Sequence, residues 1–580
     1  MINTKSATFL ENPITTEIIR NALISAAEEM NESLARSSFS PIIYEMKDCS
    51  VGIYNENAEL LGQSSGLPMF LGNLDVCIIE TTRFIGGNKH YKPGDIYIMN
   101  DSYLAGSHLN DITVISPIFF EKELVGFSAT RAHWLDIGAK DPGYPMDATE
   151  IYQEGVRIPP TKIYDGGEPR KDIINLITIN SRMTKDALGD LNAQIAACRT
   201  GEKRLNDIIN KHGLKTFRRS IKDIFMQSEL LDKEQISSIP DGIYEEVGYL
   251  DNDGVTDEPV LVKVTVTIKG EHLKIDLTGS SEQRQGMTNC GQAQTVSACR
   301  VAFKHLIGPN SPVTGGNFKT MDIVVPKRTI FSAEEPAACG WYFTSLGLLI
   351  DLIIKALSPV LKEQSAAAHY GDSMVITVAG QDDKTKSSFL YVEPTAGGWG
   401  AFSENDGQSG LINNSNGDFK NLPVEVLEGK YPLKVNSYGL RKNSGGAGKT
   451  RGGLGVIREY EIRSESANLS LWFERSLDPA WGIFEGNTGY PPKVTIESSQ
   501  GQEQILKVNS KLVQRGDFVR VETGGGGGFG HPFTRLPELV LEDYLDGYID
   551  IDTALVEYGV VIDINLQEVN QQKTKEYRNK

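Results

Sequence analysis

The sequence is poor in cysteine and histidine, with six cysteines and eight histidines in 580 residues. None of the cysteines forms a CxxC pair, so the ligand spacing of zinc ribbons and the redox motif of thioredoxins are absent. Cysteines scattered in this way through a long chain are typical of reduced, buried thiols. We therefore expect a cytoplasmic protein without disulfides.

Long hydrophobic runs are also missing. The most apolar helical stretch, residues 345–357, is interrupted by Asp351 and is shorter than the about 20 residues that span a bilayer. Residues 1–12 are polar and lack the apolar core of a signal peptide. These absences predict a protein that neither crosses nor binds a membrane.

Positive charge is scarce, because 58 Lys and Arg residues face 76 Asp and Glu residues, which gives a formal net charge of −18. No basic run with interleaved aromatic residues occurs. Nucleic-acid binding needs a basic face, so we expect no nucleic-acid partner. The acidic excess is typical of a solvated surface.

The remaining composition is that of a folded globular protein, with 39% hydrophobic and 23% charged residues. A chain of 580 residues exceeds what one hydrophobic core usually serves, so several lobes are expected. The 58 glycines indicate many turns and close backbone approaches.

Apolar periodicity predicts a mixed α+β fold. Helices are expected where apolar residues recur at helical spacing, at residues 13–36, 182–212, 290–306 and 340–370. Strands are expected at residues 49–54, 95–99, 111–115, 124–129, 260–268 and 273–277. Beyond residue 371 the pattern changes to short strands and glycine-rich turns.

This pattern predicts three lobes, strand-rich at both ends and helical in the middle. The first, residues 1–169, is a strand-rich lobe with a leading helix and the candidate metal site. The second, residues 170–370, mixes helices and strands, and the third, residues 371–580, is rich in β-strands and glycine.

The most informative segment is residues 94–138, which contains two predicted strands joined by a short turn. His108 and Asp111 stand before and at the start of the first strand, and His133 and Asp136 follow the second. A hairpin brings the residues before its first strand next to those after its second. We therefore expect these four side chains to lie together.

Two imidazoles and a carboxylate suit Zn²⁺, Mn²⁺ or Fe²⁺, and three protein ligands leave an open position for catalysis. We predict His108, Asp111 and His133 as the ligands of a divalent metal. Asp136 is expected as a fourth ligand or as the partner that holds an imidazole in one tautomer, and Asp101 as a further supporting carboxylate. The alternative is two unrelated histidines at strand ends.

Glu45 and Asp48, just before the strand at residues 49–54, are candidates for a general base that activates water. Acidic residues in this position are also common in turns. Downstream, a buried glutamate or arginine within residues 149–160 either orients the site or forms a structural ion pair.

Two glycine-rich stretches resemble anion-binding loops. Residues 444–450 end like a P-loop, but that motif requires glycine where Asn443 stands. Gly524–Gly528 could cradle an anion with backbone N–H groups, or form a flexible turn or a subunit contact. Neither stretch predicts an ATPase site in this chain.

At these residues the sequence resembles the hydantoinase B/oxoprolinase family. The matches span nearly the whole chain and include Asn100-Asp101-Ser102-Tyr103, Gly106-Ser107-His108, Asp111–Val114, Arg131-Ala132-His133, residues 148–155, Arg157–Pro160, residues 189–191, 421–425, 444–448, 451–453, 524–530 and 558–560. The sequence departs from the family at Ser102, where proline is common, at Ala105–His108, where Gly-Gly-Thr-His is common, and near Glu45, where many members have an Arg-Glu-Arg-type stretch.

The resemblance implies the catalytic subunit of an ATP-dependent hydrolase that opens a cyclic amide such as a hydantoin, 5-oxoproline or a lactam. It implies a hydantoinase A-type ATPase partner that binds ATP and Mg²⁺, often in a heterotetramer. The partner phosphorylates a carbonyl oxygen or bicarbonate, and the B-type protein completes hydrolysis or carboxylation. Related ketone carboxylases carry a metal on the residues that match His108, Asp111 and His133.

Two other functions stay open. A ketone carboxylase subunit would use activated bicarbonate, although such subunits tend to be longer than this chain. A non-catalytic scaffold for an ATPase is the other alternative, and the intact set of three ligands speaks against it.

Overall fold

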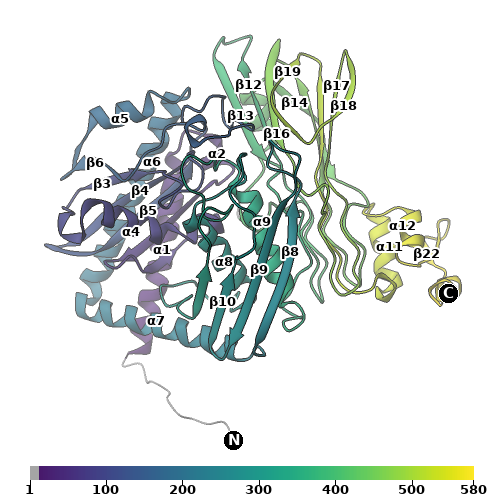
Figure 1. The fold of residues 1–580 in the computed structure, drawn as a ribbon, viewed down its shortest axis with the longest axis horizontal. Coiled ribbons are helices and arrows are strands. Elements are labelled where there is room, and N and C mark those ends of the chain that lie inside the picture. Colours follow the sequence, from purple (N-terminus) through teal and green to yellow (C-terminus); the bar gives the residue numbers. More distant parts are fainter. Residues whose placement is uncertain (1–11, 418, 580) are drawn as a thin grey trace, which may run out of the picture.

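The computed structural model describes residues 12–417 and 419–579 and confirms the α+β class. Figure 1 shows a helix-covered sheet at the N-terminal end, a second sheet with two helices beside it, and a group of strands that leads to a small helical module at the C-terminus. None of the helices in the described part of the chain has both the length and the apolarity needed to cross a bilayer.

The N-terminal lobe is built on a seven-stranded antiparallel sheet with the strand order β2-β1-β5-β4-β3-β6-β7. Its strands are β1 (Cys49–Asn55), β2 (Leu60–Gln63), β3 (Ile96–Met99), β4 (Asp111–Phe120), β5 (Glu123–His133), β6 (Thr161–Asp165) and β7 (Glu168–Pro169). The hairpin expected from the sequence is β4–β5, and it lies in the middle of the sheet.

Helices cover both faces of this sheet, and their apolar sides fit the alternation of strand residues. Val114 of β4 packs towards α6, while its neighbour Ile115 packs towards α4 on the other face. The helices of the lobe are α1 (Pro13–Ser37), α2 (Pro41–Tyr44), α3 (Pro68–Leu71), α4 (Leu74–Ile85), α5 (Lys171–Thr178), α6 (Thr184–His212) and α7 (Leu214–Ser237), with short 3-10 turns at Asn88–His90 and Ile151–Gln153.

The leading helix begins where the sequence predicts it. Asn12 caps α1 by accepting a hydrogen bond from the backbone N–H of Thr15 at 3.1 Å, and Pro13 occupies the first helical position. The predicted helix at residues 182–212 is α6, which packs on α1 and on the β4–β5 hairpin. The helical segment therefore covers the sheet that carries the candidate site.

The middle of the chain forms a four-stranded sheet with the order β11-β10-β9-β8, against which α9 packs. Its elements are β8 (Gly242–Leu250), β9 (Val260–Lys269), β10 (His272–Asp276), α8 (Gln292–Leu306), β11 (Met321–Val324) and α9 (Tyr342–Leu357). The helix expected over residues 340–370 stops at Leu357, because Pro359 has no backbone N–H with which to continue it.

Two further sheets face each other in the C-terminal part, with the orders β13-β12-β16-β19 and β14-β15-β20-β17-β18. The hydroxyls of Tyr391 and Tyr460 meet between them at 3.1 Å, and the buried Arg458 pairs with Glu393 at 2.8 Å. The elements are β12 (Val375–Gln381), β13 (Ser388–Pro394), α10 (Val424–Lys430), β14 (Leu433–Leu440), β15 (Val456–Ile462), β16 (Ser466–Trp472), β17 (Lys493–Ser498), β18 (Gly501–Gln504), β19 (Lys507–Gln514) and β20 (Phe518–Glu522).

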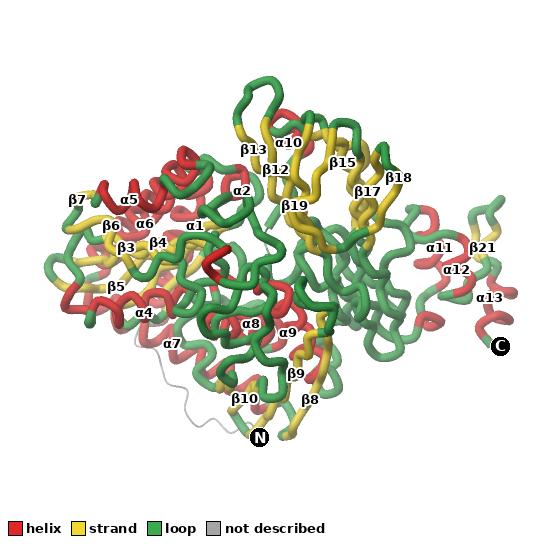
Figure 2. The backbone as a smooth tube through the Cα atoms, turned by 45° about the horizontal axis from the view of Figure 1, so that its top comes forward, coloured by secondary structure: helices red, strands yellow, loops and turns green. Residues whose placement is uncertain are grey.

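The glycine-rich stretches interleave in what we call the glycine bundle, residues 397–400, 444–453 and 524–530, which lies among the loops of Figure 2 between the strands and the C-terminal helices. Gly526 donates to the carbonyl of Gly453 at 2.9 Å, and Gly453 donates to that of Trp399 at 2.8 Å. A Cβ on Gly526 would lie 1.9 Å from the Trp399 oxygen, so only glycine permits this approach.

The hydrogen bonds of the glycine bundle exclude an anion cradle made by the N–H groups of residues 525–528. The N–H groups of residues 525–528 all donate to backbone carbonyls, those of Tyr490, Gly453, Ala368 and Asn487. Since these donors are engaged inside the protein, the run has a structural role. The P-loop-like residues 444–450 belong to the same bundle.

A small module closes the chain, and Figure 1 shows it projecting beside the glycine bundle. Arg535 anchors it by pairing with Asp406 at 2.6 Å and with Asp543 at 2.8 Å. Its elements are a 3-10 turn (Pro532–Thr534), α11 (Pro537–Leu545), α12 (Ile551–Val556), β21 (Ile562–Asp563), β22 (Glu568–Val569) and α13 (Gln571–Arg578).

Candidate metal centre

His108, Asp111 and His133 meet at one end of the β4–β5 hairpin. Asp111 is the first residue of β4 and is paired with His133, the last residue of β5. Asp111 Oδ1 lies 2.9 Å from His108 Nε2 and 2.9 Å from His133 Nδ1, and the two ring nitrogens are 3.1 Å apart. All three side chains are buried.

The spacing of these three atoms fits a divalent cation. Bonds of about 2.0–2.2 Å from one ion to imidazole nitrogen and carboxylate oxygen place neighbouring donor atoms about 3 Å apart. Among the residues that the structure describes, this is the one group of three or more His, Cys, Asp or Glu side chains whose donor atoms converge. The arrangement can therefore hold a metal ion.

The electrostatics of the cluster favour the protonation states that metal ligands need. Burial opposes ionisation of Asp111, but its interactions with His108 and then with His133 outweigh burial and hold the pKa of Asp111 below its usual value. Burial lowers the pKa of His133. Asp111 is thus ionised and His133 neutral at physiological pH.

The ligand atoms that face away from the cluster are also hydrogen-bonded. His108 Nδ1 lies 3.1 Å from the carbonyl oxygen of Gly340, and His133 Nε2 lies 3.0 Å from the hydroxyl of Tyr144. Asp111 Oδ2 accepts hydrogen bonds from the hydroxyls of Ser107 and Tyr342. These contacts keep the remaining atoms, Nε2, Nδ1 and Oδ1, directed at one another.

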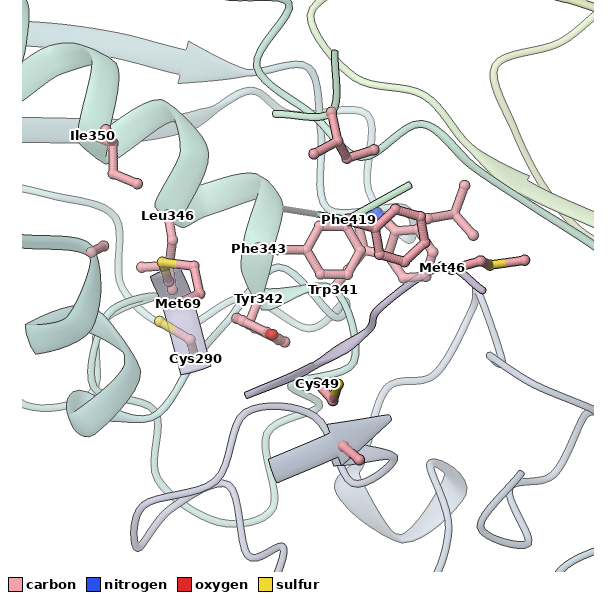
Figure 3. Packing of buried hydrophobic residues seen from close by; sticks show 14 of the residues in the cluster. Met46, Cys49, Met69, Cys290, Trp341, Tyr342, Phe343, Leu346, Ile350 and Phe419 are labelled. Carbon is pink, nitrogen blue, oxygen red and sulfur yellow. The ribbon is translucent and has the colours of Figure 1, made fainter. Parts of the chain in front are cut away.

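Aromatic rings enclose the cluster where α9 begins. The ring of His108 lies 5.2 Å from each of the rings of Tyr144 and Tyr342 and 6.2 Å from that of Phe343. Figure 3 shows Trp341, Tyr342 and Phe343 following one another at this helix end, and the rings of Trp341 and Phe343 lie 4.8 Å apart. This wall separates the cluster from the surrounding solvent.

The structure corrects the role expected for Asp136. Its carboxylate is buried, but Oδ1 pairs with Arg182 Nη1 at 2.8 Å and Oδ2 accepts the backbone N–H of Arg182 at 2.7 Å. It therefore fixes the start of α6 against the loop after β5. Gly340 and Tyr144 hold the imidazoles in its place, because the chain turns after His133 and directs Asp136 away.

Asp101 is buried near the site without contacting its imidazoles. It accepts the backbone N–H of Tyr103 at 3.0 Å through Oδ1, and Oδ2 lies 3.4 Å from Arg157 Nε. Its backbone oxygen accepts the N–H of Gly106 at 2.8 Å. Asp101 thus shapes the turn that leads to His108.

The two candidate bases differ in their placement. Asp48 is buried, and its backbone oxygen accepts the N–H of His133 at 3.1 Å. Burial and then the nearby charge of Asp111 raise the pKa of Asp48 well above its usual value. Glu45 is partly exposed at the end of α2. The pKa of the neighbouring Tyr44 is raised mainly by the burial of Tyr44 and next by the charge of Glu45.

Sequence reasoning missed Tyr144, Gly340 and Tyr342. Gly340 and Tyr342 stand 232 and 231 residues from His108 and Asp111, and Tyr144 lies in the loop 11 residues after His133. No periodicity marks any of them. One signal was present, because Trp341-Tyr342-Phe343 directly after Gly340 is the longest aromatic run in the sequence.

Comparison with known proteins now adds to this geometry. A family model described as hydantoinase B/oxoprolinase matches residues 12–532. The chain belongs to the hydantoinase B/oxoprolinase family. This confirms the family resemblance seen in the sequence.

Individual members of the family support the assignment over the full length. The chain is 33% identical over 586 residues to the B subunit of a putative D-/L-hydantoinase of Pseudomonas sp. (strain NS671), with 98% of each chain covered. Its fold is similar to the crystal structure of the ATP-dependent caprolactamase from Pseudomonas jessenii, with a TM-score of 0.91 and 28% identity over 100% of both chains.

A solved structure with lower sequence identity is similar to this chain in fold only. The nucleotide-free structure of acetone carboxylase superposes with a TM-score of 0.89 at 20% identity, covering 99% of this chain and 84% of the other. The hydantoinase B/oxoprolinase fold is thus common to proteins that bear the names of hydrolases and of a carboxylase.

Proposed function

We propose that this chain is the metal-binding catalytic subunit of an ATP-dependent cyclic-amide hydrolase that opens a hydantoin, 5-oxoproline or lactam ring. The observation that carries the proposal is the convergence of His108 Nε2, Asp111 Oδ1 and His133 Nδ1 in a buried site walled by aromatic rings. Relatives named hydantoinase, caprolactamase and 5-oxoprolinase support the choice of a cyclic amide.

We assign the metal, Zn²⁺ or Mn²⁺, to these three residues. Such an ion would act as a Lewis acid and would lower the pKa of a water molecule. Hydrolysis of an unreactive amide needs a nucleophile activated in this way. The hydrogen bonds from Ser107 and Tyr342 occupy Asp111 Oδ2 and leave Oδ1 for the ion. Trp341, Tyr342 and Phe343 keep bulk water from the reacting atoms.

Asp48 is the group that we assign to proton transfer. It lies beside the cluster, and its Oδ1 has no hydrogen-bond partner among the described residues. Burial and then the charge of Asp111 raise the pKa of Asp48 well above the usual value, so this carboxyl holds a proton more readily than an ordinary aspartate, as proton transfer requires. The partly exposed Glu45 is the second candidate for this role.

ATP and Mg²⁺ belong, in this proposal, to a hydantoinase A-type ATPase subunit that phosphorylates the carbonyl oxygen of the substrate. The engagement of the glycine-bundle N–H groups by carbonyls supports placing the nucleotide outside this chain. Two relatives are named as the B or beta component of a hydantoinase and of a caprolactamase, which supports a partner. We propose that the two subunits form a heterotetramer. We place it in the cytoplasm, in keeping with six cysteines that are all buried.

The test is to produce the chain with its hydantoinase A-type partner and to supply ATP with a panel of hydantoins, 5-oxoproline, lactams and ketones. ATP-dependent ring opening of one cyclic amide, abolished in His108→Ala, is the expected result. Ketone-dependent fixation of labelled bicarbonate would overturn the proposal in favour of a carboxylase. Substrate turnover that survives in His108→Ala, Asp111→Asn and His133→Ala alike would point to a scaffold.

A further inference from the structure

Glu154 is a buried carboxyl group that the mechanism above does not use. It follows the 3-10 turn Ile151–Gln153, and its Oε1 accepts the backbone N–H of Cys339 at 2.8 Å and that of Gly340 at 2.7 Å. We infer that Glu154 is a positioning residue which fixes His108 through Gly340, and so selects the ring nitrogen that faces the metal.

The contact runs through a single residue. Gly340 gives its N–H to Glu154, and its carbonyl oxygen lies 3.1 Å from His108 Nδ1. A carbonyl can only accept, so His108 Nδ1 carries the hydrogen in this contact. In the neutral ring Nε2 then keeps its lone pair, and Nε2 is the atom that faces Asp111 and His133.

Glu154 does not form the structural ion pair that was the alternative. Burial raises the pKa of Glu154 to about 8, opposed only by the two backbone N–H groups. Its Oε2 is buried without a hydrogen-bond partner among the described residues. An isolated carboxyl is costly to bury, and both of its contacts go to the segment that carries the partner of His108.

The size of residue 340 matters to the same contact. A Cβ on Gly340 would lie 3.0 Å from Glu154 Oε1 and 3.0 Å from Met287 Sδ. Glycine lets the carboxyl approach both N–H groups without displacing the peptide.

The same loop has another anchor that does not lead to an imidazole. The hydroxyl of Tyr103 donates to the carbonyl of Ala337 at 2.5 Å, three residues before Gly340. Removing this hydrogen bond loosens the loop without touching the link between Glu154 and His108. Tyr103→Phe is therefore the matched control for a purely structural effect.

The inference rests on the proposed metal site, and its test uses Co²⁺ alone as the probe, without substrate or partner. Glu154→Met removes the acceptor at similar size, whereas Glu154→Gln keeps an acceptor oxygen and resembles the protonated carboxyl. Loss of a group that orients a metal ligand typically weakens metal affinity about 10–100-fold. We expect that loss, with an altered visible absorption spectrum of bound Co²⁺, for Glu154→Met.

The other variants should separate positioning from stability. Glu154→Gln should bind Co²⁺ with the affinity and spectrum of the natural protein. Tyr103→Phe should also keep both of these properties, but its Tm should be lower. Gly340→Ala, which displaces the same peptide, should weaken Co²⁺ binding and gives a second test if Glu154→Met does not fold. Natural affinity and spectrum in Glu154→Met or Gly340→Ala would overturn this inference alone. A natural protein that binds no Co²⁺ would overturn the metal site as well.

Discussion

Asp111 and His133 stand directly opposite each other across β4 and β5, with Asp111 Oδ1 2.9 Å from His133 Nδ1. The register of an antiparallel pair decides which side chains meet, and a slip of one residue would turn each to the other face. Here the register is held by the buried alternation of Val114 and Ile115 towards helices on opposite faces. The candidate centre is therefore built into the central hairpin of a rigid sheet.

The hydroxyl of Tyr144 should matter to metal binding although it is not a ligand. In Tyr144→Phe, His133 Nε2 loses its partner at 3.0 Å and the ring is less firmly oriented. We expect about tenfold weaker Zn²⁺ affinity, measured by competition with a chelating dye. Tyr152→Phe, on an exposed ring, is the control. Equal Zn²⁺ affinity in the two variants would show that the Tyr144 hydroxyl does not support metal binding.

Asp136 should matter to stability and not to the metal. Asp136→Asn weakens the contacts to the start of α6, where Arg182 Nη1 lies at 2.8 Å. We expect a loss on the order of 1–3 kcal/mol, seen as a lower Tm, because a buried charged hydrogen bond is removed. Elemental analysis should find the natural metal content. Loss of metal at unchanged Tm would return Asp136 to the ligand-supporting role.

The glycine bundle should not tolerate a side chain. In Gly526→Ala the new Cβ would lie 1.9 Å from the Trp399 carbonyl oxygen, and hydrogen-bonded neighbours prevent the backbone from moving away. We expect a destabilisation on the order of 4 kcal/mol or more, or failure to fold. Gly439→Ala, with no atom within 4 Å of the new Cβ, should leave Tm nearly unchanged. Similar Tm values for both variants would contradict the packing described for the bundle.

Glu154 should make stability depend on pH. Its pKa is raised from 4.5 to about 8 by burial, so the folded state favours the protonated form. The stabilisation from this group is complete below pH 4.5 and is lost as pH rises through about 8. The side chain of Glu154→Gln stays neutral at every pH. Between pH 4.5 and about 8 its Tm should therefore rise further and further above that of the natural protein. The largest difference should correspond to about 5 kcal/mol in the free energy of unfolding.

A control separates this effect from general alkaline destabilisation. Glu258→Gln replaces a side chain that is 80% exposed, so its Tm should follow the natural profile at every pH. Parallel profiles for Glu154→Gln and the natural protein would show that Glu154 titrates normally in the fold.

The sequence could predict those site residues that a single hairpin brings together. The strand pattern around residues 111–133 placed Asp111 and His133 together, because pairing in a hairpin is local. His108 followed, since it stands three residues before Asp111. Helices α1 and α6 were predictable for a similar reason, as apolar spacing reports which face of a helix is buried.

The remaining part depends on contacts between distant segments. Gly340 and Tyr342 reach His108 and Asp111 across 232 and 231 residues of sequence. Local periodicity carries no information on such contacts, which arise when the start of α9 meets the end of the β4–β5 hairpin in the folded chain. The glycine bundle was missed for the same reason, because its three stretches meet only in the folded chain.

The metal content of the purified chain decides whether His108, Asp111 and His133 form a metal centre. We predict about one Zn²⁺ or Mn²⁺ per natural chain, a ratio lost in His108→Ala and retained in His272→Ala, which replaces an exposed histidine of β10. With its ATPase partner, His108→Ala should also fail to open a cyclic amide. A His108→Ala protein that keeps the full natural metal content would contradict the assignment of the centre.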